Sequence, residues 1–459
     1  MTEQGTAGRS TPATALCGAT VLVSLDPPEV TSCDVVLAGG RVVGLGRAPD
    51  GAARRDCSGT LVAPGNVCAH HHLYSALASG MPYRLAPPRN FIEILQRVWW
   101  RLDRALDEES VRASALRGGL DALLSGTTTV VDHHASPNFI DGSLDVIADA
   151  LAQLGLRSVL CYEVTDRDGP ERARAGVAEN RRFLAHRPEL ARGMVGAHAS
   201  FTLSDETLAA CAEAAAAAAT GVHIHVAEDA ADQRDSAERC GRRVLERLCG
   251  AGIVDERALL AHCVHVNRGE AQIVTTSGAT VVCNPRSNMN NGVGHSPFNQ
   301  TTPPPEGPKV ALGTDGIGGD MVTESQLGFF RAREADVLIP PSWPLARLAE
   351  GSRFVGRAYG EPLLGTLRPG APADIVVYDY PSPTPLHAGN LSGHWLFGLS
   401  PRHVRDVYVD GELVVAGRTP TRVDWGRVAA DSAATARRLW QRTEELQPHP
   451  YQPKGSAQA

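Results

Sequence analysis

The sequence lacks the features that would place a protein in a membrane, in a secretory route or on nucleic acid. Its 459 residues include 44 Lys and Arg against 51 Asp and Glu, and the net charge of −7 gives no basic surface for nucleic acid or anionic lipid. No stretch approaches the ~18 consecutive apolar residues that span a bilayer. The first residues, MTEQGTAGRSTPATALC, contain neither the basic nor the apolar region of a signal peptide. We therefore expect a cytoplasmic protein without a membrane or nucleic-acid partner.

The sequence also lacks closely spaced pairs of cysteines, and it has very few lysines. The ten cysteines are scattered without a Cys-x-x-Cys pair, which favours reduced and mostly buried thiols over a disulfide framework. Lysine occurs only at Lys309 and Lys454, and every other basic residue is arginine. This bias is typical of a high-GC genome and indicates no function by itself.

Apolar strand-like runs alternate with helix-like segments through the middle of the chain. Because the runs are nearly continuous in apolar residues, they predict buried parallel strands. Eight such repeats favour the α/β class and a (β/α)8 TIM-type barrel over residues 63–370. An open doubly wound sheet is the alternative, but no Gly-x-Gly-x-x-Gly follows the first run. The eight runs are residues 65–72, 126–134, 157–164, 193–201, 221–228, 259–266, 280–288 and 309–316.

The two ends of the chain resemble each other in pattern. Residues 1–62 and 371–425 both read as short strands separated by Gly and Pro, and VRDVYVDGELVVAG has the Asp-Gly turn of a hairpin. These pieces predict one small β-sandwich domain completed by both ends. Residues 426–459 are expected to form a C-terminal helix and tail.

Three adjacent histidines, His70, His71 and His72, end the first predicted strand. Side chains alternate between faces along a strand, so His70 and His72 share a face and His71 points the other way. Two imidazoles on one face with one residue between them are a common metal-binding arrangement. A surface cluster or a tag is the alternative, although a tag would lie at a terminus.

The other predicted strands also end in polar residues. In TIM-type barrels the active site lies at the carboxyl ends of the strands. A single histidine or carboxylate there is usually a satisfied structural group, but the repetition on most strands indicates a site. The residues are His133, His134, Glu163, His198, His225, Glu228, His262, His265, Asn288 and Asp315.

Several motifs in this chain resemble those of the amidohydrolase superfamily, in the same order. They are APGNVCAHHHLYSAL, GTTTVVD, HIHVAE, AHCVHV, NPRSNMNNGVG and GTDG. The chain looks like the branch of metal-dependent deaminases and chlorohydrolases. VWWRLDRALDEE, VVDHHASPNFIDGS and CYEVTDRDG are most similar to SsnA-type aminohydrolases. The resemblance covers roughly residues 15–425, and implies a barrel, a small β-sandwich, a mononuclear metal site and hydrolysis, but no particular substrate.

Position by position, the resemblance implies four metal ligands: His70, His72, His225 and Asp315. His71 is then a bystander, and it departs from the small or polar residue more usual in the family. Three imidazoles and one carboxylate suit zinc, with ferrous iron as the alternative, and leave a position for water. We expect one divalent ion per chain, most simply Zn²⁺.

The resemblance also implies catalytic roles. Glu228, three residues after His225, is expected to act as general acid, and His262 to hold the attacking hydroxide. Asp315 would carry the proton of the water to the departing ammonia.

Substrate contacts are expected from His198, His134 and His265. Only one of the neighbours His133 and His134 can face the pocket, and His265 is alternatively a support behind the site.

The lack of lysine bears on the number of metal ions. Binuclear members of the superfamily use a carboxylated lysine on a middle strand, commonly the fourth, and the predicted fourth strand GMVGAHASF has none. Glu163 on the third strand is the remaining residue that could bridge two ions, so a mononuclear site is the simpler interpretation.

We therefore expect a metal-dependent aminohydrolase that attacks a C=N carbon of a small nitrogen heterocycle and releases ammonia. The alternatives are a hydrolase of the same fold with another leaving group, such as chloride or a cyclic amide, and a metal-binding partner protein without catalysis. Glu228 and His262 argue against the last, because metal binding alone needs neither. We also expect a homo-oligomer, a dimer or a tetramer.

Overall fold

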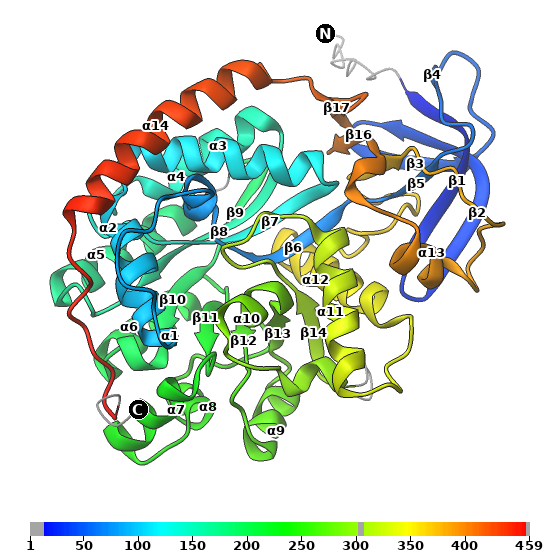
Figure 1. The fold of residues 1–459 in the computed structure, drawn as a ribbon. Helices are drawn as coiled ribbons and strands as arrows, with labels where there is room; N and C mark the ends of the chain where they lie inside the picture. Colours follow the sequence, from blue (N-terminus) through cyan, green and yellow to red (C-terminus); the bar gives the residue numbers. More distant parts are fainter. Residues whose placement is uncertain (1–12, 187, 302–306, 456–459) are drawn as a thin grey trace, which may run out of the picture.

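The computed structural model describes residues 13–186, 188–301 and 307–455, which form a barrel with a curled sheet beside it (Figure 1). Eight parallel strands follow one another around the barrel in sequence order. Thr314 and Asp315, after the last strand, donate backbone hydrogen bonds to His70 O at 2.9 and 3.1 Å, so the last strand meets the first. The predicted TIM-type barrel is thereby confirmed. Its strands are β6 (Asn66–His71), β7 (Thr127–His134), β8 (Arg157–Val164), β10 (Val195–Ala199), β11 (Val222–Val226), β12 (Leu259–His262), β13 (Thr280–Cys283) and β14 (Lys309–Leu312), and the short β9 (Ala191–Gly193) pairs with β8.

Every residue of β7 and β8 is buried, because side chains fill the inside of the barrel and helices cover its outside. Local signals start and stop these helices. Asp107 accepts a hydrogen bond from Ser110 N at the start of α3, and Gly155 ends α4 in the left-handed conformation at φ 75°. The outer helices are α3 (Glu108–Leu124), α4 (Ser143–Leu154), α5 (Pro170–Leu184), α6 (Asp205–Ala217), α7 (Ala230–Cys240), α8 (Val244–Gly250), α9 (Arg268–Ser277), α10 (Pro285–Asn291), α11 (Met321–Ala335) and α12 (Trp343–Tyr359).

Both ends of the chain build the second sheet, in the order β18-β17-β16-β15-β5-β1-β2-β3. The sheet is curled, so that its edge strand β3 lies against the segment just before the central strand β15. There Val42 in β3 exchanges backbone hydrogen bonds with Gly370 and Ala371. It thereby encloses a separate apolar core that includes Val35, Val62 and Ile375. The strands are β1 (Thr14–Leu25), β2 (Pro28–Ala38), β3 (Arg41–Gly46), β4 (Ala53–Asp56), β5 (Leu61–Pro64), β15 (Ile375–Tyr378), β16 (Val404–Val409), β17 (Glu412–Ala416) and β18 (Thr419–Pro420), with β4 paired to β1.

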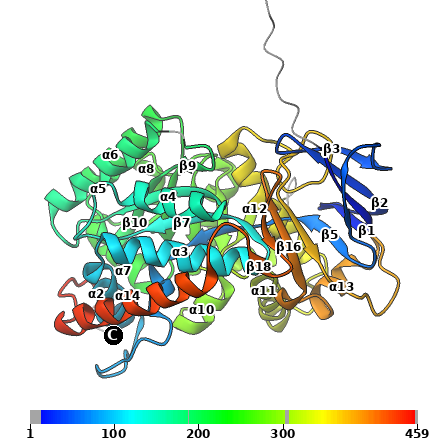
Figure 2. The ribbon, with the colours of Figure 1, turned by 90° about the horizontal axis from the view of Figure 1, so that it is seen from above.

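The C-terminal helix α14 (Trp425–Glu445) packs along α2 (Trp100–Ala105) and α3, as both ribbon views show (Figures 1 and 2). The tail after it runs over η2 (Leu95–Trp99), where His449 N donates to Gln96 O at 2.9 Å and Gln96 Nε2 donates to Tyr451 O at 2.7 Å. The tail thus holds one wall above the strand ends. The remaining short helices are η1 (Leu73–Ala78), α1 (Phe91–Ile94), η3 (Ser200–Thr202), η4 (Pro297–Gln300), α13 (Leu391–Phe397) and η5 (Pro401–His403).

Two predictions concern what is absent. All ten cysteines are free thiols. In the described ranges, no helix has both the length and the apolar character needed to cross a membrane.

Candidate active site

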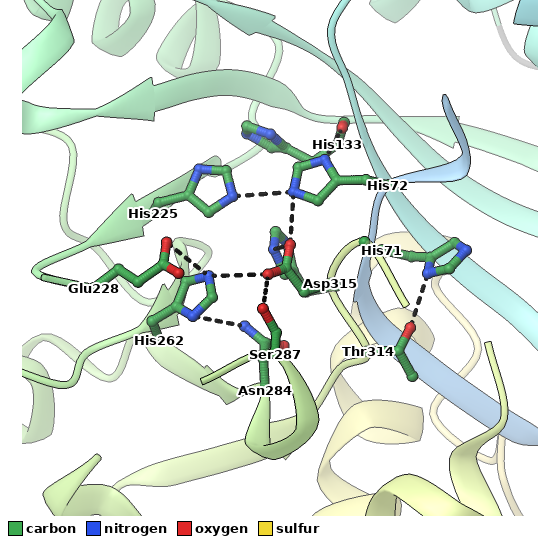
Figure 3. Close-up of polar contacts among 12 residues, drawn as sticks. His71, His72, His133, His225, Glu228, His262, Asn284, Ser287, Thr314 and Asp315 are labelled. Carbon is green, nitrogen blue, oxygen red and sulfur yellow. Dashed lines mark hydrogen bonds and ion pairs between the residues drawn. The ribbon is translucent and has the colours of Figure 1, made fainter. Parts of the chain in front are cut away.

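The first strand places its three histidines as the alternation of side chains predicts. The rings of His70 and His72 contact each other, and that of His70 contacts His225, at the strand ends. His71 points away from His72 and bonds Thr314 Oγ1 through Nδ1 at 2.8 Å (Figure 3). All three side chains are buried. His71 therefore belongs to the packing between β6 and the end of β14.

The turn after β14 brings Asp315 to the same cluster. A Cβ on Gly313 would lie 2.7 Å from His70 N, so only glycine permits this close approach. Asp315 itself has a left-handed backbone at φ 54°, a conformation that costs free energy and is concentrated at functional sites. Its Oδ1 lies 3.0 Å from His72 Nε2 and 3.5 Å from His70 Nε2.

Backbone carbonyls fix the tautomers of two histidines. His72 Nδ1 lies 2.6 Å from His133 O, and His225 Nδ1 lies 2.8 Å from His198 O. A carbonyl only accepts, so both Nδ1 atoms carry a proton, and Nε2 is the atom of each ring that is left to bind a metal ion. These two Nε2 atoms are 3.2 Å apart.

His70 is held by another histidine. Its Nδ1 lies 2.8 Å from His223 Nε2, and His223 Nδ1 lies 3.6 Å from Cys161 Sγ. If His70 Nδ1–H donates to His223, His223 in turn donates from Nδ1 to the sulfur, and His70 Nε2 keeps its lone pair. In the part of the chain that the structure describes, this Nε2 has no hydrogen-bond partner.

The four predicted ligands therefore fit a divalent cation. Three imidazole lone pairs and a carboxylate converge within a few ångströms, and the pair 3.2 Å apart repels unless a cation or a proton lies between them. Burial lowers the pKa of His70 and His225, which keeps them neutral as metal ligation requires. Burial also opposes charge on His72, but Asp315 outweighs it and raises the His72 pKa to about 9. Without a cation, a proton on His72 balances the carboxylate.

Glu228 and His262 lie together beside Asp315 (Figure 3). His262 Nε2 is 3.5 Å from Glu228 Oε2 and 3.9 Å from Asp315 Oδ2, while its Nδ1 bonds Asn288 Oδ1 at 2.8 Å. Burial raises the pKa of Glu228 to about 7. This carboxyl group can thus both give and take a proton near neutral pH, as general acid–base catalysis requires.

A cavity opens over this cluster and has apolar and polar walls. Of the three histidines expected to contact substrate, His198 lines this cavity, whereas His134 and His265 are not among the described residues that line it. His134 Nε2 bonds Ser136 Oγ at 2.8 Å, and His265 Nε2 bonds Val293 O at 2.9 Å. Of the adjacent pair, His133 is the one whose ring contacts His72 and His225, because β7 turns that face inward. The lining includes His72, Tyr74, Phe91, Leu95, Trp99, Trp100, Glu163, Arg167, Phe201, His225, Glu228, Asp232, Asn291 and Asp315.

Sequence reasoning missed several of these residues. His223 could have been found, since the alternation in VHIHV puts it on the face of His225. Ser287, which donates to Asp315 Oδ2, and Arg167 lie beyond strand ends, where the sequence gives no side-chain direction. Lys309 begins β14 and bonds Gly278 O at 2.9 Å, so it has a structural partner.

The match to a known family covers most of this architecture. The model of the Amidohydrolase family matches residues 61–414, and the chain belongs to this family. As the sequence predicted, it is a hydrolase that acts on carbon–nitrogen bonds.

Similar proteins fall in the predicted branch of deaminases and chlorohydrolases. A 5-methylthioadenosine/S-adenosylhomocysteine deaminase of Desulforudis audaxviator is 29% identical over 426 residues, 88% of this chain and 94% of the relative. A 5'-deoxyadenosine deaminase of Methanosarcina mazei is 26% identical, over 91% of this chain and 96% of the relative.

Two solved structures share the fold. A zinc-bound adenosine deaminase from Xanthomonas campestris has a TM-score of 0.78 at 21% identity, covering 95% of this chain and 100% of that chain. Atrazine chlorohydrolase from Arthrobacter aurescens TC1, complexed with zinc, has a TM-score of 0.78 at 23% identity, covering 92% and 100%.

Proposed function

We propose that this enzyme releases ammonia from an amino-substituted nitrogen heterocycle, using one Zn²⁺ ion held by His70, His72, His225 and Asp315. The observation that carries the proposal is the position of the Glu228 carboxyl group, whose Oε2 lies 3.5 Å from His262 Nε2 beside the ligand cluster. Burial there raises the pKa of Glu228 to about 7. A ring nitrogen needs a proton before the neighbouring carbon accepts a nucleophile, and Glu228 can supply it. The relatives named as deaminases support the same reaction.

When bound, the metal ion supplies a water molecule that loses a proton near neutral pH. Glu228 gives its proton to the ring nitrogen as the water oxygen bonds the C=N carbon, and Asp315 Oδ2 takes one proton of the water. His262, held by Asn288 through Nδ1, positions the attacking oxygen with Nε2. Asp315 then passes its proton to the amino group, the C–N bond breaks and ammonia leaves. The remaining hydroxyl proton returns to Glu228, which leaves a carbonyl on the ring.

The test is a coupled ammonia assay on amino-substituted purines, pyrimidines and pterins, run beside chloride and ring-opening assays on halogenated and cyclic-amide compounds. Chloride leaves without protonation, so a dehalogenase would gain less from Glu228. We expect ammonia from at least one aminated ring and its loss in Glu228→Gln. Turnover confined to the halogenated or cyclic-amide compounds would overturn the deaminase proposal.

The metal is checked by elemental analysis of protein purified without added metal. We expect about one zinc per chain, and iron in its place would correct the identity of the ion alone. A cytoplasmic location and a dimer or tetramer stay predictions, checked by fractionation of the source cells and by light scattering.

A further inference from the structure

A second set of polar side chains lines the cavity without a role in the proposed chemistry. Glu163 is the next-to-last residue of β8, Arg167 lies three residues after this strand, and His198 lies near the end of β10. Their side chains are 3%, 1% and 8% exposed, so their polar atoms depend on partners within the protein or the cavity.

Arg167 is fixed on two sides and open on the third. Its Nη2 donates to Asp103, and its Nε donates to Asp168 Oδ2 at 3.3 Å. The guanidinium packs over the ring of Trp100, with 5.2 Å to its centroid. Its Nη1 has no hydrogen-bond partner among residues 13–186, 188–301 and 307–455. A rigid donor that makes no hydrogen bond to the described residues therefore borders the cavity.

Glu163 supplies an acceptor next to that donor. Its Oε2 is 3.0 Å from Nδ1 of His133, and the other ring nitrogen of His133, Nε2, lies 3.1 Å from His223 O. The other oxygen, Oε1, lies 3.5 Å from Arg167 Nη1 and 3.8 Å from His198 Nε2. Both separations exceed an ordinary hydrogen bond, so Oε1 can accept from a ligand.

His198 supplies a second acceptor. Its Nδ1 lies 2.7 Å from Thr202 Oγ1, and the Thr202 hydroxyl donates to Ala199 O at 3.1 Å. With its only proton used there, Thr202 accepts from His198 Nδ1–H. The neutral imidazole then presents the lone pair of Nε2 to the cavity.

We propose that Arg167, Glu163 and His198 form a subsite for a lactam edge, a ring carbonyl next to a ring N–H, on the substrate. This inference rests on the proposed deaminase function and names its substrate class. Arg167 Nη1 donates to the carbonyl, Glu163 Oε1 accepts the ring N–H, and His198 Nε2 accepts a neighbouring N–H or amino group. Guanine- and pterin-type rings carry this edge. Adenine has no carbonyl, so it would leave Arg167 Nη1 unpaired.

The aromatic walls agree with a flat ring at this place. Trp99, Trp100 and Phe201 line the cavity with Phe91. Stacking faces of this kind hold any planar heterocycle, so the polar subsite is what separates one ring from another.

The first test needs no variant. kcat/KM for ammonia release is measured with the wild-type holoenzyme on guanine and pterin and on adenine, adenosine and 5'-methylthioadenosine. We expect the lactam rings to be favoured by at least about 100-fold, because a site built to hydrogen-bond a group rejects rings without it. Equal or better turnover of the adenine compounds would overturn the lactam subsite and leave the deaminase function standing. No ammonia from any ring would overturn both.

The second test separates recognition from structure. Arg167→Gln should raise KM for lactam rings at least tenfold with a smaller change in kcat, and should lower kcat/KM for lactam rings more than for adenine rings. Arg172→Gln is the matched control, because Arg172, like Arg167, pairs with Asp168, and its Nη1 lies 3.5 Å from Asp168 Oδ1. Its side chain is 43% exposed and is not among the residues that line the cavity. An equal loss on both ring types in folded Arg167→Gln would contradict the subsite. If Arg167→Gln does not fold, the subsite is tested by KM for lactam rings in Glu163→Gln and by the wild-type comparison of lactam and adenine rings.

Discussion

The two sides of the ligand cluster differ in how directly the sequence encodes them. Glu228 lies two residues after the end of β11 and His262 ends β12, so both belong to local motifs, and Asn288, the partner of His262, lies one turn into α10. On the other side, Arg167 meets Asp103, 64 residues earlier in the chain, and Glu163 meets His133, 30 residues earlier. The first side carries groups that reactions of this type share, and the second carries groups that recognise one ring. Chemistry is therefore local in this sequence, whereas recognition depends on tertiary contacts.

The largest expected effect comes from removing a ligand that both sides depend on. His225→Ala should lose the bound metal and all measurable activity, since three remaining ligands leave an incomplete site. Elemental analysis and the ammonia assay measure this. Undiminished metal content in the variant would contradict the ligand assignment.

Glu228→Gln comes next and tests the chemical side alone. The amide keeps the shape but cannot give a proton, so kcat should fall by about 10²–10⁴-fold while the metal stays bound. Glu163→Gln is the control from the other side, and we expect its main effect on KM. Loss of metal in Glu228→Gln would make Glu228 a ligand and the general-acid role wrong.

Removing His223, which supports His70 from behind, should have a moderate effect on metal affinity. His223→Leu removes the acceptor 2.8 Å from His70 Nδ1, and losses of this kind lower metal affinity by about 10–100-fold. His223→Gln keeps an oxygen that can accept, so it should recover part of the affinity. Competition with a chelating dye measures both variants. Equal affinity in His223→Leu and wild type would show that His70 needs no such partner.

Metal affinity should also depend on pH, with a sign set by His72. In the metal-free protein Asp315 raises the pKa of His72 to about 9, so its imidazole is protonated below that pH. The metal must displace this proton, and affinity should rise about tenfold per pH unit between pH 6 and 8. Calorimetry in buffers of different ionisation enthalpy should detect the released proton. An affinity independent of pH over this range would contradict it.

How far the sequence reaches follows from these elements. Buried parallel strands give nearly continuous apolar runs in the sequence, so the barrel and its strand order could be predicted. The predicted run Arg157–Val164 matches β8 at both ends. Several other predicted runs were too long, because the chain leaves β11 and β12 at the left-handed residues Ala227 and Cys263. A left-handed non-glycine residue leaves no trace in a pattern of apolar residues. A similar limit applies to the choice of His134 over His133. Strand alternation puts the two side chains on opposite faces, but it does not tell which face points into the barrel.

The smallest effect on the site is expected from His71, the middle histidine. His71→Ala removes a buried side chain that points away from the cluster and bonds Thr314 Oγ1 at 2.8 Å. The Thr314 hydroxyl also contacts Cys68 Sγ at 3.2 Å, so it keeps one weak partner. We expect the metal and most activity to remain, while the free energy of unfolding falls by about 1–3 kcal/mol from the lost hydrogen bond and packing. Chemical denaturation and elemental analysis on the same sample separate the two quantities. His71→Asn, which can still bond Thr314, should lose less stability, and a variant that keeps full stability but loses metal would place His71 in the site after all.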